Sequence, residues 1–300
     1  MKKPLSHVGR PGAMRFDGDP RWRTPLQRAF RPPDGFDERA LTHGFHAWPA
    51  RLHPFIARTL IPLAPAGGAI ADPFMGSGTT PLEALIAGRA AIGNDLNPIG
   101  FEVAWTRTRL GAPALVGRAK ALVREAQALV GGPIDPLFER AVVDWFDPVA
   151  LAEVYALRTA VMRACSAPAG AGAGGDDVAR ILRAVLSSIL VKLSLQVSDS
   201  VTRVARPAPH SGGGRHGGGG TRSPKERVFH WFIGRAAELE GQLKGAPGAG
   251  RAAAGRGRPS PAWCWATRAP PRRTCPASAP SSPRRRTPAS ATTSATTCCA

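Results

Sequence analysis

The stretch of sequence that decides the fold is Asp72-Pro73-Phe74-Met75-Gly76-Ser77-Gly78-Thr79-Thr80. The apolar residues 68–72 run into it and end on an acid, which is typical of a buried parallel strand. From Pro81 to Ala87 the spacing predicts a helix, with proline early in the first turn and Gly88 closing it. A strand, a glycine-rich turn and a helix in this order predict a βα unit of an α/β fold.

The glycines of this turn favour a bound ligand. Gly76 and Gly78 can adopt positive φ and let a ligand approach the backbone closely. The following helix presents free N–H groups and a partial positive charge to an anionic group. A second short strand, residues 90–95, ends on Asp95, where a carboxylate can accept hydrogen bonds from ribose hydroxyls. The two strand ends together predict a site for a nucleotide-like ligand.

Other ligands, or none, are the alternatives for this turn. A P-loop is excluded because no Gly-Lys-Ser/Thr follows the glycines. A dinucleotide fold needs Gly-x-Gly-x-x-Gly, and Pro81 follows Thr80 here, so no third glycine is in register. A tight turn without a ligand would account for a lone Gly-x-Gly, but not for the whole string of residues 71–80.

This string resembles motif I of the DNA amino-methyltransferase family, the N4-cytosine and N6-adenine DNA methylases, whose usual form is Asp-Pro-Phe-x-Gly-Ser-Gly-Thr-Thr. The continuation through Glu83-Ala84, Gly88-Arg89 and residues 92–98 also looks like that family. The resemblance implies an α/β, Rossmann-like fold that binds S-adenosyl-L-methionine, with Asp95 on the ribose and the glycine turn on the methionine side. The cofactor-binding residues implied in this way are Asp72, Pro73, Phe74, Gly76, Ser77, Gly78, Thr79, Thr80, Asp95, Asn97 and His46.

A segment upstream of the turn extends the resemblance. Residues 43–51, His-Gly-Phe-His-Ala-Trp-Pro-Ala-Arg, are similar to the segment that the family places before motif I, over the methionine end of the cofactor. Its two histidines, His43 and His46, are equally well explained as turn residues with satisfied hydrogen bonds. Weaker similarity at residues 197–203 and 223–229 extends the resemblance over residues 41–243.

The family's partner is double-stranded DNA with the target base flipped out of the helix. Arg203, Arg206 and Arg222, with Arg215 and the glycines between them, have the charge to follow a phosphate backbone, whereas a solvated loop is the alternative. The resemblance implies no metal, because the cofactor itself supplies the electrophile.

The family's catalytic tetrapeptide, Ser/Asp/Asn-Pro-Pro-Tyr/Phe, is absent from the sequence. In the family its first side chain and a backbone carbonyl accept hydrogen bonds from the target amine, while its ring stacks on the flipped base. Tyr155 is the only tyrosine, and low-complexity sequence without acids follows residues 224–243, where the motif is expected. No catalytic residue is therefore assigned, and we expect methyl transfer by this chain to be impaired.

A shifted reading frame is one explanation for this absence. Codons able to encode residues 282–287, regrouped by one base, read Thr-Ser-Pro-Pro-Tyr, and those of residues 279–281 give a small residue and two aliphatic ones. Codons for residues 262–269 regroup to Val-Val-Leu-Gly-Asp-Ala-Arg, the kind of strand that family members carry shortly before the catalytic one. We interpret the tail as a frameshifted or truncated reading of the catalytic half. The alternative is a genuine disordered basic tail that binds nucleic acid without specificity.

Composition sets the remaining bounds. Of the formal net charge of +19, ten charges come from Lys244 and the nine arginines after Glu240, the last acidic residue. The rest of the chain is therefore only moderately basic, which still suits a nucleic-acid enzyme. Cys165 is the single cysteine before the tail, as expected of a reduced, cytoplasmic protein, and no signal peptide or membrane span is predicted.

Patterning divides the chain into six segments. These are an N-terminal arm or loop (1–40), the cofactor-binding βα core (41–110), a helical insertion (111–205), a Gly/Arg-rich loop (206–222), a helix returning to the core (223–245) and a low-complexity, disordered tail (246–300). We expect helices over residues 55–61, 113–131, 148–165, 176–195 and 224–243, with an Ala/Gly-rich linker over 166–175. In the fourth helix the buried face is expected to comprise Ile181, Leu182, Val185, Ile189 and Leu193.

The expected function is site-specific DNA methylation, as in restriction-modification systems, at N4 of cytosine or N6 of adenine. A related alternative is an RNA guanine-N2 methyltransferase, which has a similar motif I. Those enzymes usually carry a separate N-terminal RNA-binding domain, for which residues 1–41 leave no room. A third alternative is a non-catalytic nucleic-acid-binding remnant, which the absent tetrapeptide favours. The target base, the recognition sequence and the oligomeric state are not indicated.

Overall fold

A computed structural model describes residues 14–110, 114–166, 177–198, 201–204, 227–246 and 262–263. All of them belong to one structural unit, Met1–Ala266. The Gly/Arg-rich loop of residues 206–222, nearly all of the linker of residues 166–175 and most of the tail lie outside the described residues.

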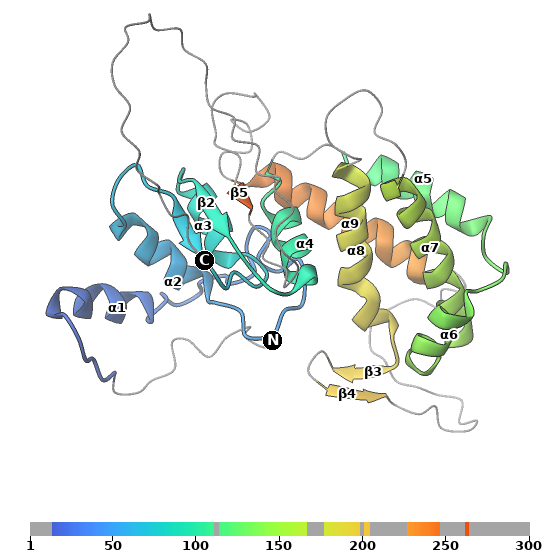
Figure 1. The fold of residues 1–300 in the computed structure, drawn as a ribbon, viewed down its shortest axis with the longest axis horizontal. Helices are drawn as coiled ribbons and strands as arrows, with labels where there is room; N and C mark the ends of the chain where they lie inside the picture. The colour runs from blue at the N-terminus through green and yellow to red at the C-terminus, as the bar shows by residue number, and fades with distance from the viewer. Residues whose placement is uncertain are drawn as a thin grey trace, which may run out of the picture. The chain divides into compact units, whose positions relative to one another are not determined.

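Three short strands form a parallel sheet (Figure 1). β1 (Ile70–Asp72) pairs with β2 (Ala91–Gly93), and β2 pairs with β5 (Ala262–Trp263). The helix α3 (Thr79–Ile86) joins β1 to β2, as a parallel pair requires a crossover connection. The two strands and the helix expected around the glycine turn are confirmed, although both strands are shorter than expected.

Among the described residues, one face of this sheet is covered and the other is open. The helix α2 (Pro54–Leu60), the turn η2 (Ile61–Leu63) and α3 pack on the covered face through the apolar side chains Ala57, Ile61, Ala84, Ala91 and Ile70. On the opposite face Ala71 is exposed, and 39% of Ile92 is exposed. Parallel sheets normally have both faces covered. The arrangement is compatible with an incomplete α/β fold, and a Rossmann-like sheet remains a prediction.

The main hydrophobic core lies among four helices, α5 (Val116–Gln127), α7 (Pro148–Ser166), α8 (Asp177–Leu193) and α9 (Arg227–Gly245) (Figure 1). The helices expected in these regions are confirmed, and the predicted face of α8 is buried as expected. The carboxylate of Glu240 on α9 accepts hydrogen bonds from the backbone N–H groups of Leu115 and Val116. This pairing satisfies donors that the first turn of α5 otherwise leaves free.

Among the helical elements that patterning did not predict, η1 (Pro20–Trp22), α4 (Pro98–Arg107) and α6 (Pro136–Val142) begin in the same way. η1 leads directly into α1 (Arg23–Ala29), inside the arm expected to be a loop, while α4 follows β2 and α6 precedes η3 (Val143–Trp145). Asp19, Asn97 and Asp135 cap them through side-chain oxygens, and each is followed by proline. Proline disfavours the helical conformation in the residue before it and starts a helix without losing a hydrogen bond.

Two further differences concern strands. β3 (Gln196–Ser198) and β4 (Val201–Val204) form an antiparallel hairpin at the end of the segment expected to be helical. β5 lies in the tail, where the sequence has no periodicity, so the expectation of a wholly disordered tail is wrong for Ala262 and Trp263.

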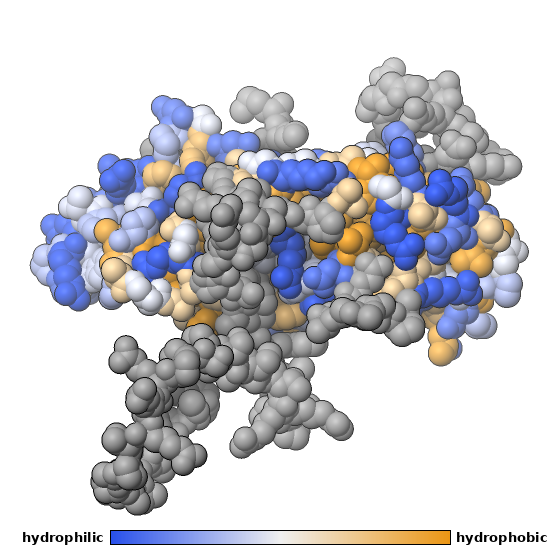
Figure 2. Space-filling view, turned by 90° about the horizontal axis from the view of Figure 1, so that it is seen from above, coloured by the Kyte–Doolittle hydropathy of each residue, from blue (hydrophilic) through white to orange (hydrophobic). Residues whose placement is uncertain are grey.

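Hydrophilic residues cover much of the face seen in Figure 2, with apolar residues exposed between them. No helix in the described part of the chain is long and apolar enough to cross a membrane.

Candidate functional site

The glycine turn between β1 and α3 has the backbone conformation that its sequence predicts. Gly76 has φ of +51° and Gly78 has φ of +82°, both in the left-handed region that glycine adopts without strain. A Cβ atom at Gly78 would lie 2.6 Å from the Cβ of Ala104 on α4, and one at Gly76 would lie 2.9 Å from Nε1 of Trp48. Packing as well as conformation therefore requires glycine at both positions.

The acids at the two strand ends hold the turn together. The Asp95 carboxylate accepts hydrogen bonds from the backbone N–H groups of Gly76, at 2.7 Å, and Asn97, at 2.8 Å. Asp72 accepts one from the N–H of Phe74 at 3.1 Å, and Asn97 caps α4 through the N–H of Ile99. The structure thus brings Asp95 to the glycine turn, as predicted. Each Asp95 oxygen keeps a second lone pair for a ligand hydroxyl.

Large apolar side chains are exposed beside this turn. Phe74 is 86% exposed, Leu96 is 76% exposed and Ile99 is 52% exposed. They follow the ends of β1 and β2, which is the edge where parallel sheets bind ligands. Of the three, only Phe74 is among the predicted cofactor-binding residues; Leu96 and Ile99 lie within two residues of the predicted Asn97.

Other predicted cofactor residues are less accessible. Ser77 and Thr79 are each 2% exposed. Ser77 accepts hydrogen bonds from Arg107 through both its carbonyl and its hydroxyl oxygen, at 2.5 and 2.9 Å. The hydroxyl of Thr79 is buried and has no hydrogen-bond partner among the described residues. Pro73 is exposed and Thr80 is partly exposed, so these two remain open to a ligand.

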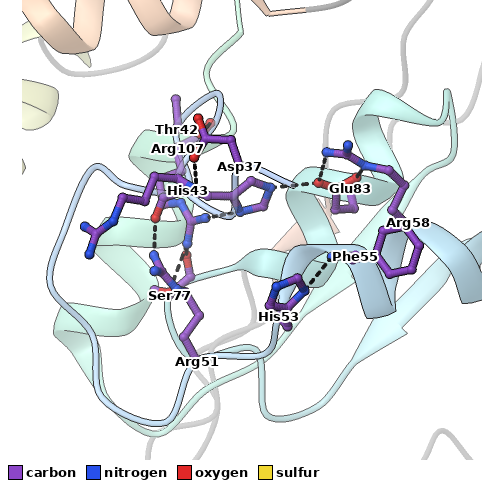
Figure 3. A network of polar contacts seen from close by, with 11 residues as sticks. Asp37, Thr42, His43, Arg51, His53, Phe55, Arg58, Ser77, Glu83 and Arg107 are labelled. Carbon is purple, nitrogen blue, oxygen red and sulfur yellow. Dashed lines mark hydrogen bonds and ion pairs between the residues drawn. The ribbon is translucent and has the colours of Figure 1, made fainter. Parts of the chain in front are cut away.

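A buried polar network fixes the turn to the rest of the site (Figure 3). His43 joins Glu83, with Nε2 and Oε1 2.7 Å apart, to Arg107, whose Nη2 lies 2.6 Å from Nδ1. Because arginine can only donate hydrogen bonds, Nδ1 of His43 is the acceptor. The single ring proton of the neutral imidazole therefore lies on Nε2, which faces Glu83. Arg58 makes two further hydrogen bonds to Glu83, at 2.8 and 2.9 Å.

The charges of this network follow from burial and pairing. Burial lowers the pKa of His43 to about 4, so the ring is neutral at neutral pH. Burial raises the pKa of Glu83, but hydrogen bonds from His43 and Arg58 outweigh that effect and the net shift is downward. Burial lowers the pKa of Arg107 to about 9, which still leaves it charged at neutral pH. His43 is thus a satisfied, buried residue in this structure, and sequence left both interpretations open.

The segment of residues 43–51 reaches the turn through Trp48. Its Nε1 lies near Gly76, and a Cβ atom at Gly100 would lie 3.0 Å from Cη2 of the same ring. His46 contacts the carbonyl of Ala47, at 2.7 Å, and the hydroxyl of Ser187, at 3.1 Å. His46 and Trp48 also line a pocket between this segment and the helices α8 and α9.

The predicted nucleic-acid contacts stay predictions. Arg203 lies on β4, whereas Arg206, Arg215 and Arg222 lie outside the described residues. Within the described ranges no cluster of His, Cys, Asp or Glu has the composition to hold a metal ion.

Part of the chain is similar to a known enzyme. Over 85 residues, 27% of this chain, it is 35% identical to the type II methyltransferase M.MvaI of Kocuria varians. The aligned part covers only 19% of that relative's length. No protein-family model matches the chain, and no solved structure is similar to it. The similarity indicates a relationship to methyltransferases, but its extent is too small to assign the chain to the relative's family.

Proposed function

We propose that residues 41–110 bind S-adenosyl-L-methionine and that the function is methylation of an exocyclic amine in DNA, at cytosine N4 or adenine N6. The observation that carries the proposal is the glycine turn with the Asp95 carboxylate fixed at its Gly76 amide. The partial similarity to a type II methyltransferase supports the same choice.

The residues around the turn fit this cofactor. The absence of side chains at Gly76 and Gly78 lets a ligand reach the backbone, and the N-terminus of α3 favours a carboxylate. The free lone pairs of Asp95 suit ribose hydroxyls. The exposed side chains of Phe74 and Leu96 offer an apolar surface beside the cofactor, with Phe74 on its methionine side, as the resemblance implies.

The predicted cofactor residues are proposed to have two different roles: some shape the turn, and others contact the ligand. Ser77 and Thr79 are buried, so we assign them to shaping the turn through their backbone. Pro73, Thr80, Asn97 and His46 stay proposed ligand neighbours. When bound, the cofactor supplies an electrophilic methyl group, and the protein contributes orientation and exclusion of water.

Methyl transfer by this chain is proposed to be impaired, because no Pro-Pro-Tyr tetrapeptide is present to orient the amine. A non-catalytic nucleic-acid-binding role is the second candidate, and the same absence favours it. Separate incubations with methyl-labelled cofactor and either DNA or RNA distinguish these candidates and the RNA guanine-N2 alternative. Label in DNA shows retained activity, label only in RNA supports the guanine-N2 alternative, and no label despite cofactor binding supports the non-catalytic role.

Cofactor binding is tested by equilibrium dialysis with labelled S-adenosyl-L-methionine. Asp95→Ala should weaken binding by about tenfold or more, the effect of losing hydrogen bonds to a charged group. Phe74→Ala should weaken binding about fivefold, because an exposed apolar contact is lost without disturbing the fold. The matched controls are Asp144→Ala and Leu137→Ala, which remove an exposed acid and a side chain that is 79% exposed, both away from the turn. Equal binding by Phe74→Ala and Leu137→Ala would contradict the proposed site.

A further inference from the structure

We infer that the pocket between residues 39–51 and the helices α8 and α9 binds a phosphate group of a DNA strand. Its volume is about 340 Å³. Sites for small ligands range from about 300 to 1,000 Å³, so the pocket is large enough for one nucleotide unit. The inference rests on the proposed function for the choice of DNA, and it concerns other residues than the predicted Arg203, Arg206 and Arg222.

The charge of the pocket selects an anion. Four lining residues are cationic, namely Arg39, Arg51, Lys192 and Arg235, and no lining residue is acidic. They belong to the segment of residues 39–51 and to the helices α8 and α9, so these charges come together only in the folded chain. Burial lowers the pKa of Arg51, Glu38 opposes that shift, and the like charge of Arg39 adds to it. An anion between the two guanidinium groups reduces this repulsion.

The cationic side chains of the pocket differ in how firmly existing hydrogen bonds hold them, and so in how freely they can move toward a phosphate. Arg235 donates to the carbonyls of Gly44, at 2.9 Å, and Phe45, and it pairs with Glu238. Arg51 donates to the carbonyl of His43. These bonds position the two guanidinium groups at the pocket wall. Lys192 is exposed, and its ammonium lies 5.2 Å from the ring centroid of Trp231, so it can turn toward a phosphate at little cost.

The pocket also adjoins the glycine turn through Trp48. This ring lines the pocket and also lies against Gly76 and Gly100. Aromatic side chains beside a basic groove stack on unpaired bases of single strands. A strand whose phosphate lies in the pocket therefore has a base next to Trp48, and so next to the turn proposed to hold the cofactor.

The test measures the salt dependence of DNA binding by the full-length protein, using fluorescence anisotropy of a short labelled duplex of random sequence. Each phosphate contact contributes about 0.9 to the slope of log affinity against log salt. Lys192→Gln should therefore lower the slope by about 0.9 and weaken binding about fivefold, as expected for one exposed ionic contact. Lys192→Arg should restore the slope, because it keeps the charge.

The matched control is Lys120→Gln, which removes an exposed charge from α5, outside the pocket. Comparing variants isolates one contact, since the basic tail contributes equally to all of them. Ultraviolet crosslinking of the same DNA should label the peptide that contains Trp48, and less so in Lys192→Gln. The inference is overturned by an equal slope change in both glutamine variants, and also by a wild-type protein that does not bind DNA.

Dialysis with labelled cofactor on the same samples separates this inference from the proposed function. Cofactor binding with an unchanged slope in Lys192→Gln refutes only the pocket assignment. A lowered slope without cofactor binding keeps the pocket and refutes the proposed cofactor. Competition of S-adenosyl-L-methionine with DNA for the Lys192 contact also overturns the inference, because the pocket then holds the carboxylate of the cofactor.

Discussion

Replacing Gly78 by alanine should destabilise the protein by about 2–4 kcal/mol. The left-handed conformation, with φ of +82°, costs an alanine about 1–2 kcal/mol. Overpacking adds about 1–3 kcal/mol, because the new Cβ would lie 2.6 Å from the Cβ of Ala104 and 2.9 Å from its Cα. A stiffer unfolded chain recovers about 0.4–1 kcal/mol. The backbone of α4 cannot move as easily as a flexible side chain, so this clash is not readily relieved.

Two other glycines distinguish the cost of the left-handed conformation from the cost of overpacking. Gly88, at the other end of α3, has φ of +76° but nothing within 4 Å of its Cβ position, so Gly88→Ala should cost only about 0.5–1 kcal/mol. Gly234 lies in α9 with open space and no positive φ, so Gly234→Ala should stabilise by about 0.5–1 kcal/mol. The free energy of unfolding is measured by urea titration with far-UV circular dichroism. Equal effects at Gly78 and Gly88 would falsify the packing argument.

Two predictions concern the buried network. The folded-state pKa of His43, about 4, lies below its ordinary value of 6.5, so the unfolded state takes up a proton first as the pH falls. The free energy of unfolding should therefore fall by about 2–3 kcal/mol between pH 6.5 and 4.5. Urea titrations at several pH values should show a smaller fall for His43→Gln. An unchanged pH profile in that variant contradicts the buried neutral ring. Arg107→Met should cost about 3–5 kcal/mol because it leaves several buried acceptors on His43 and Ser77 unpaired. Arg118→Met, which removes only a solvent-exposed pair with Glu125, should cost at most about 1 kcal/mol, and comparable losses for the two variants in thermal and urea unfolding would argue against a buried role for Arg107.

The sheet around the glycine turn was predictable because its signals are local. Apolar runs that end on Asp72 and Asp95 indicate parallel strands within a few residues of sequence. The turn η1 and the helices α4 and α6 were missed although their signal is also local, an Asp or Asn followed by proline. Hydrophobic periodicity is weak in such short helices, so the cap is the better indicator.

The buried network could not be predicted from local signals. Its bonds join residues far apart in sequence, such as His43 with Glu83 and with Arg107. Arg107 ends a short helix and has the sequence context of an ordinary exposed arginine, yet it is 1% exposed. The pocket is similar, since Lys192 and Arg235 approach Arg51 only through the packing of α8 and α9. Motif resemblance predicted which residues belong to one site, but not which of them are buried.

The bonds of Arg107 also limit when the glycine turn can become rigid during synthesis. Ser77 and His43 both depend on this one side chain, which lies 30 residues after the first and 64 after the second. Domains fold as units once their chain is available, and contacts between distant residues form late because closing a loop costs entropy. Until Arg107 has left the ribosome, the turn is a nascent strand end with an unpaired histidine beside it. A pause in translation before that point therefore prolongs exposure of an unfinished glycine turn.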